Sequence, residues 1–346
     1  TPLLHMEVSG TEVGDEIMAL INPLSWETDI DLATKLEFTC QNPGREISDR
    51  KIFQPGNEID VFIDYRAVDY ESGPTLASDV ETYLGRVEII KSTPDFGDSQ
   101  VLRVTGYDKS WNLMKDENEG EALAGSTHST IVENLAKKWG LEPDVRGTKL
   151  VETWFTRKGV STHQIIKGLA NLHNFEYYVE FRPYGIHDPA GADRAGGAFK
   201  GKWYLVWKPF SDIGQDTKYV FDYGSDSSPI LSFKPEFAFL GQRTKLEVVA
   251  WDSATNQPIT ATEETPAPIA EENLLYNDNE KLRQGMTSSI LLAMDKFHVE
   301  ILTAREFATS ADINEYANAW FERNKSNFMK ADARLIGVPG LKARQI

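Results

Sequence analysis

The feature that most constrains this fold is a series of short apolar or alternating segments separated by turn signals in the first 120 residues. Four such segments lie at 36–40, 59–65, 84–90 and 101–105. Turn sequences rich in Pro, Gly and Asn separate them, at 42–44, 54–57, 72–74 and 94–98. Many short strands with regular turns are typical of a β-sandwich or a small barrel. We therefore predict a β structure for residues 1–120.

The hydrophobic period changes near residue 121. Apolar residues from Ile131 to Trp139 follow helical spacing, and Gly140 stands where a helix would stop. A second helix is predicted from Ser161, because Gln164 three residues later completes a capping box, and it is predicted to end at Asn174. Two strands at 175–181 and 203–207 follow, with a Gly- and Ala-rich loop at 188–201 between them. Residues 121–228 are therefore predicted to form an α+β unit.

The last third returns to β patterns. Strands are expected at 230–233, 244–251 and 331–336, with a loop or linker at 262–273 and a turn at 337–340. One helix is expected at about 312–327, with Tyr316, Trp320 and Phe321 on or beside its apolar side. The expected fold class is α+β, mainly β.

Charge is unevenly distributed along the chain. The net charge is −17, and residues 1–120 hold 10 basic and 24 acidic side chains. This balance argues against a protein that grips nucleic acid phosphates. Two interpretations of the acidic third remain open: a solvated surface, or a face that repels polyanions or attracts a basic partner. No apolar run is long enough for a membrane helix, and no secretory signal is visible.

Chemistry-bearing motifs are scarce. The histidines form no metal-binding spacing such as HExxH, and His163 and His173 are too far apart on one helix to share a metal. No nucleophile elbow, phosphate loop or dinucleotide fingerprint occurs, and Cys40, the single cysteine, is expected to be a buried inert thiol. We predict no catalytic, cofactor-binding or metal-binding residues. Trp203 and Trp207 share one strand face, which favours core or interface over a sugar- or base-stacking platform.

The order of these elements, with several local sequences, resembles the late-control-D family. Its members are baseplate hub proteins of contractile-tailed phages and related tail-like injection particles, and the type VI secretion spike–hub protein is a more distant relative. The resemblance covers most of the chain and depends on the combination of the segments FQPGNEI at 53–59, LGRVE at 84–88, VLRVTGYD at 101–108, STHQIIKGLA at 161–170, LSFKP at 231–235 and GVPGL at 337–341.

The resemblance implies a trimeric structural hub and no enzyme. Two tube-type β-barrel domains, at 1–120 and 229–346, would flank an α+β insertion at 121–228. Three copies would form a ring that adapts the six-fold tail tube to the three-fold central spike, with DNA or cargo passing through the lumen without specific binding. The implied partners are the spike, the tail tube and baseplate wedge or sheath-proximal proteins. The implied place is the baseplate of a virion or tail-like particle assembled in the bacterial cytoplasm, without membrane embedding.

Within this interpretation, Tyr316, Trp320 and Phe321 are predicted to contribute to an oligomer interface. The acidic first third would line the lumen or face outward. Two alternative functions remain, a tail-tip cell-wall hydrolase and a carbohydrate-binding tail protein that uses Trp203 and Trp207. The chain departs from the family in a longer loop at 188–201. It also lacks a strand pair expected after residue 346, which implies a partial sequence or a second barrel completed by another chain.

Overall fold

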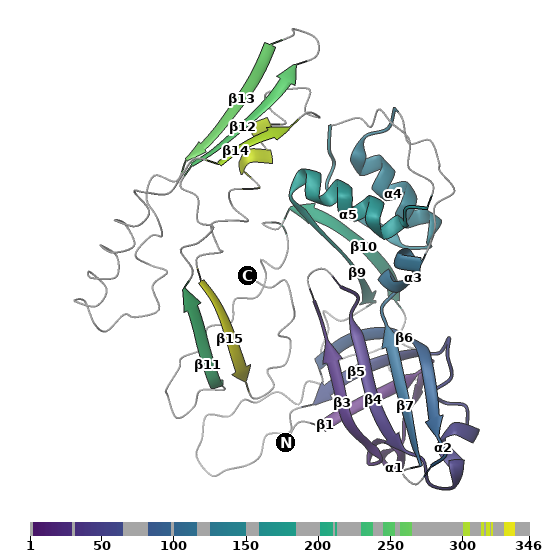
Figure 1. Ribbon diagram of the computed structural model, residues 1–346. Helices are drawn as coiled ribbons and strands as arrows, with labels where there is room; N and C mark the ends of the chain where they lie inside the picture. The colour runs from purple at the N-terminus through teal and green to yellow at the C-terminus, as the bar shows by residue number, and fades with distance from the viewer. Residues whose placement is uncertain are drawn as a thin grey trace, which may run out of the picture.

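The structure, a computed structural model, is mainly β, with helices grouped in the middle of the chain (Figure 1). It describes residues 3–29, 32–64, 82–97, 100–115, 125–149, 159–184, 201–209, 212, 230–237, 245–252, 257–264, 300–304, 313–314, 316–318, 320 and 329–335. The predicted fold class, α+β and mainly β, is confirmed at this level.

The first part of the chain forms one antiparallel sheet of seven strands. Its strands are β1 (Leu3–Val8), β2 (Thr11–Glu12), β3 (Ile21–Glu27), β4 (Lys35–Gln41), β5 (Glu58–Asp64), β6 (Thr82–Asp95) and β7 (Val101–Tyr107). They pair in the order β2-β1-β5-β6-β7-β4-β3. All four predicted strands are present. Short helical turns lie between strands: α1 (Asp15–Met18), η1 (Pro43–Arg45) and α2 (Glu46–Asp49).

This sheet curves around its own core. Met6 of β1, Phe38 of β4 and Val61 of β5 belong to one buried cluster, although their strands are separated in the sheet order. Figure 1 shows β1 and β5 crossing behind β3, β4 and β7, as this shared core requires. In the part of the chain that the structure describes, β2 and β3 are the two edges of the sheet. A closed barrel is therefore not seen there.

Helices α4 (His128–Lys138) and α5 (Thr162–His173) cover one face of a second sheet, which has the order β8-β10-β9 (Figure 1). Its strands are β8 (Glu142–Val145), β9 (Phe175–Pro183) and β10 (Gly201–Pro209). Strand β8 was not predicted, and it pairs parallel with β10. A short helix, α3 (Ser110–Lys115), was also not predicted and contributes Leu113 to this core.

The predicted limits of α5 are confirmed by its caps. The Ser161 hydroxyl accepts a hydrogen bond from the Gln164 amide at 3.2 Å, and the Ser161 amide donates to Gln164 Oε1 at 3.0 Å. Asn174 ends the helix in the left-handed conformation, with φ 52°. Each cap satisfies backbone groups that have no partner within the helix.

The last third contains two small sheets. One pairs β11 (Ile230–Phe237) with β15 (Met329–Leu335), antiparallel. In the other, β12 (Lys245–Asp252) lies between β13 (Gln257–Glu264) and β14 (Glu300–Ala304), antiparallel to the first and parallel to the second. Residues 313–314, 316–318 and 320 are helical, which agrees with part of the predicted helix at 312–327.

Several strand boundaries differ from prediction. Strand β6 continues through Pro94 and Asp95, where we expected a turn, and β13 includes 262–264, where we expected a linker. Strand β14 was not predicted. The predicted turn at 337–340 and all of the predicted loop at 188–201 except Gly201 lie outside the described residues. None of the described helices is long and apolar enough to cross a membrane.

Candidate functional site

Two of the three predicted interface residues contact a core of this chain itself. Tyr316 and Trp320 are partly buried against a small cluster that includes Leu246 and Ala317. The Tyr316 carbonyl oxygen also accepts a hydrogen bond from Asn174 Nδ2 at 3.3 Å, which links this helix to the end of α5. Phe321 lies outside the described residues. The role of these residues in an oligomer interface stays a prediction.

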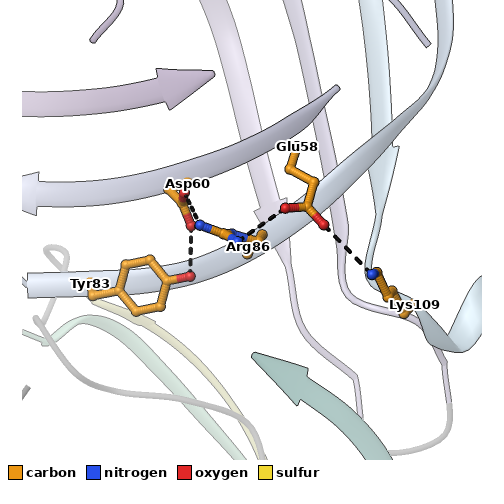
Figure 2. A network of polar contacts seen from close by, with 5 residues as sticks. All are labelled: Glu58, Asp60, Tyr83, Arg86 and Lys109. Atoms are coloured by element: carbon orange, nitrogen blue, oxygen red, sulfur yellow. Dashed lines mark hydrogen bonds and ion pairs between the residues drawn. The ribbon is translucent and has the colours of Figure 1, made fainter. Parts of the chain in front are cut away.

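A polar network of five residues is centred on β5 and β6, on side chains that point away from the core of the first sheet (Figure 2). Its centre is an ion pair between Arg86 and Asp60, with Nε to Oδ1 at 2.8 Å and Nη2 to Oδ2 at 2.7 Å. This two-point contact is the strong, directional form of an arginine–carboxylate pair. The pair is shielded from water, because 10% of the Arg86 side chain and 1% of the Asp60 side chain are exposed.

Three neighbouring groups extend this network. The Tyr83 hydroxyl donates to Asp60 Oδ1 at 2.9 Å, and Arg86 Nη1 donates to Glu58 Oε2 at 3.0 Å. Lys109 Nζ lies 3.7 Å from the other oxygen of Glu58. Figure 2 shows how Arg86 lies between the two carboxylates.

Aromatic rings of the second sheet complete the site. The Arg86 guanidinium carbon lies 3.8 Å from the centre of the Phe181 ring, and Lys109 Nζ lies 5.4 Å from that of Trp203. Phe181 and Trp203 are opposite each other on β9 and β10, and their rings meet edge to face at 5.5 Å. A cation and the face of an aromatic ring attract each other, and the attraction is stronger where water is excluded. Arg86 of the first sheet and Lys109, which lies between β7 and α3, therefore face an aromatic pair of the α+β unit.

We call this arrangement the Arg86 joint, made of Glu58, Asp60, Tyr83, Arg86 and Lys109 on one side and of Phe181 and Trp203 on the other. Burial lowers the pKa of Arg86, but its hydrogen bonds and charge attraction to Asp60 outweigh this and raise it. Burial, with Asp60 nearby, also raises the pKa of Tyr83, so its hydroxyl stays a proton donor. The geometry is suited to holding two structural units together.

The histidines form a second set of buried contacts. His128 Nδ1 and His173 Nε2 are 2.9 Å apart, which links the start of α4 to the end of α5. His163 is hydrogen-bonded to the Tyr177 hydroxyl. No group of three metal-binding side chains occurs among the described residues. The sequence analysis missed the contact between His128 and His173, because the two are 45 residues apart and no local pattern relates them.

The tryptophan platform is not available for ligand stacking. Trp203 is 6% exposed and Trp207 0%, and both belong to the core beneath α4 and α5. Of the two favoured interpretations, core or interface, core packing is therefore confirmed, and carbohydrate binding through these two rings is excluded. Cys40 is also fully buried, and burial raises the pKa of its thiol to about 11, as expected for an inert residue.

The sequence matches no family model and no curated protein. Solved structures do resemble it. A tail protein from Neisseria meningitidis matches with a TM-score of 0.55 and 11% identity, over 96% of this chain and 80% of that one. A 43 kDa tail protein of prophage MuSo2 from Shewanella oneidensis has a TM-score of 0.43 and 13% identity, over 96% and 82%. Prophage tail protein gp18 from Listeria monocytogenes has a TM-score of 0.47 and 10% identity, over 91% of this chain and 76% of that one.

The likeness with the Neisseria protein extends over nearly the whole chain, at an identity that shows the fold alone. The resemblance to tail proteins drawn from the sequence is thereby confirmed at the level of the fold. The fold of this chain is therefore that of the tail protein from Neisseria meningitidis.

Proposed function

We propose that this chain is a structural tail protein without enzymatic activity, and that it serves as the hub of a contractile-tail baseplate. The observation that carries this proposal is the fold shared with the Neisseria tail protein over 96% of the chain. The resemblance of the local sequence segments to late-control-D hub proteins supports the more specific hub role.

In this proposal three copies form a closed ring. Residues 1–120 and 229–346 each supply one tube-like barrel, and residues 121–228 are the α+β insertion between them. Six barrels would then match a six-fold tail tube, while the three-fold ring would match a central spike. The strongly curved first sheet, which wraps around its own core, supports a barrel-like role for the first third.

The proposed place is the baseplate of a virion or tail-like particle, assembled in the bacterial cytoplasm. The spike, the tail tube and wedge or sheath-proximal proteins are the proposed partners. We further propose that acidic side chains of the first third face the lumen, through which DNA or cargo passes without specific binding. Glu16, Glu37 and Glu46 are exposed, and like charges across a narrow channel would repel a polyanion.

The mass of the purified protein in solution tests the ring. Light scattering should give about 117 kDa, three times the 38.9 kDa of one chain, for the protein alone or mixed with its candidate spike. A stable monomer that does not respond to the spike would contradict the hub proposal.

The interface prediction has its own test. We propose that the helix around Tyr316, Trp320 and Phe321 packs against a neighbouring copy, so that Trp320→Glu should shift the oligomer toward monomer. Asn318→Glu is the matched control, because Asn318 is an exposed position of the same helix. An unchanged oligomer in a folded Trp320→Glu protein would rule out this helix as an interface.

A further inference from the structure

We propose that the Arg86 joint sets the orientation of the α+β unit on the first sheet, and that Asp60 acts in it as the residue that positions Arg86. The proposal starts from the two buried cores. One lies inside the first sheet and the other lies between α4, α5 and the second sheet. Each core is built mainly from its own unit, and the second core is reached from the first sheet by Leu113, just after β7, and by the ring of Tyr83.

The contacts of Arg86 fall into two kinds. Its polar partners Asp60 and Glu58 lie on β5, in the same sheet as Arg86 itself. Its aromatic partner Phe181 belongs to the α+β unit. The ion pair therefore does not join the two units directly. It fixes the plane of the guanidinium, and the guanidinium face then meets the ring.

The geometry makes this arrangement directional. Two parallel hydrogen bonds to one carboxylate and a third bond to Glu58 leave the guanidinium plane little freedom to rotate. Stacking on a ring depends on the orientation of the guanidinium plane. A lysine ammonium has no such plane and could not stack in this way. Tyr83 adds a second crossing contact, because its hydroxyl donates to Asp60 while its ring packs against the core of the α+β unit.

The Arg86 joint also covers an apolar surface that would otherwise be exposed. Phe181 and Trp203 are 9% and 6% exposed, and the side chains of Arg86 and Lys109 lie over their rings. Separation of the units would uncover the sides of both rings that the two cations cover, and would lose both cation–aromatic contacts. Contact between the two units is therefore favoured, and in this proposal the guanidinium of Arg86 sets their relative orientation.

Distances between spin labels test this proposal in the full chain. One label replaces Gln41 on β4 and the other Lys137 on α4, both exposed positions. Cys40 does not compete for the label, because it is fully buried. Excess unlabelled protein dilutes the labelled chains, so that double electron–electron resonance reports distances within one chain. The parent protein should give one narrow distance between the two units.

Arg86→Met and Asp60→Asn should both broaden or split that distance. Arg103→Met is the matched control, since Arg103 is exposed on β7 of the same sheet, and it should leave the distance unchanged. A second label pair at Gln41 and Lys91, both in the first sheet, should stay narrow in every variant. This result separates a change of orientation from unfolding of the sheet.

A single narrow distance retained in both Arg86→Met and Asp60→Asn would overturn the proposal. Phe181→Leu provides an independent test if those variants do not fold, because it removes the ring and leaves the ion pair intact. It should broaden the distance between the units in the same way. Retention of the parent distance in Phe181→Leu would show that the cation–ring contact does not set the orientation.

Discussion

At the scale of single residues, His173 gives the chain a defined response to acid. Burial, and then the charge of His128, lower the pKa of His173 from 6.5 to about 4. Below pH 6.5 the unfolded chain binds a proton at this site that the folded chain excludes, so stability falls as pH decreases toward 4. The loss at pH 4 should be about 3 kcal/mol, since one pKa unit corresponds to about 1.4 kcal/mol.

Urea unfolding at pH 7, 5.5 and 4 measures this dependence. His173→Gln, which is neutral at every pH, should lose less stability than the parent over the same range. Parallel pH curves for the two proteins would mean that His173 is not the group responsible.

Two glycines should respond in opposite ways to substitution by alanine. A Cβ at Gly85 would lie 2.8 Å from Cζ2 of Trp26, closer than carbon atoms approach, so Gly85→Ala should destabilise the first sheet by about 1–3 kcal/mol. A Cβ at Gly168 in α5 meets nothing within 4 Å, so Gly168→Ala should stabilise the protein by about 0.5–1 kcal/mol. Chemical denaturation of both variants measures the difference, and an equal effect of both would contradict this account.

At the scale of elements, the caps of α5 make its start separately testable. Ser161→Ala removes the hydroxyl that accepts from the Gln164 amide and should cost about 1 kcal/mol. Ser161→Gly should cost only a few tenths of a kcal/mol, because glycine is tolerated at this position. Denaturant midpoints of the two variants provide the comparison, and a larger loss for the glycine variant would contradict the cap.

Local signals predicted the elements that local interactions determine. The capping box at Ser161 and the C-terminal cap at Asn174 predicted both ends of α5 correctly, because each signal acts within one turn of the helix. Strand β8 was not predicted, since its four residues have no alternating pattern and depend on pairing with β10. In β6, Pro94 suggested a turn, but the residue pairs with Leu102 in the ladder.

The Arg86 joint shows why the site itself could not be predicted. The alternation in β5 places Glu58 and Asp60 on the face opposite Ile59 and Val61, which on its own indicates solvent. The structure buries Asp60 because the α+β unit lies over this face. The ring contact of Arg86 comes from Phe181, about 95 residues later in the chain, and no spacing rule connects positions so far apart.

At the scale of the whole molecule, α3 connects the first sheet to the α+β unit. It follows β7 directly, yet its Leu113 is fully buried in the core beneath α4 and α5. Leu102, eleven residues earlier on β7, is buried in the other core. The change from one core to the next therefore occurs between these two leucines, within the range 1–120 that we predicted as the first domain.

This placement predicts separate effects of two similar substitutions. Each of Leu113→Ala and Leu102→Ala should cost about 2–5 kcal/mol, the usual loss for a leucine removed from a packed core. Hydrogen exchange read by mass spectrometry should show Leu113→Ala weakening protection in α4, α5 and β9, while β4 and β7 keep theirs. Leu102→Ala should show the reverse. Equal loss of protection in both regions for either variant would mean that the two cores open as one cooperative unit, and the boundary between them would then lie elsewhere.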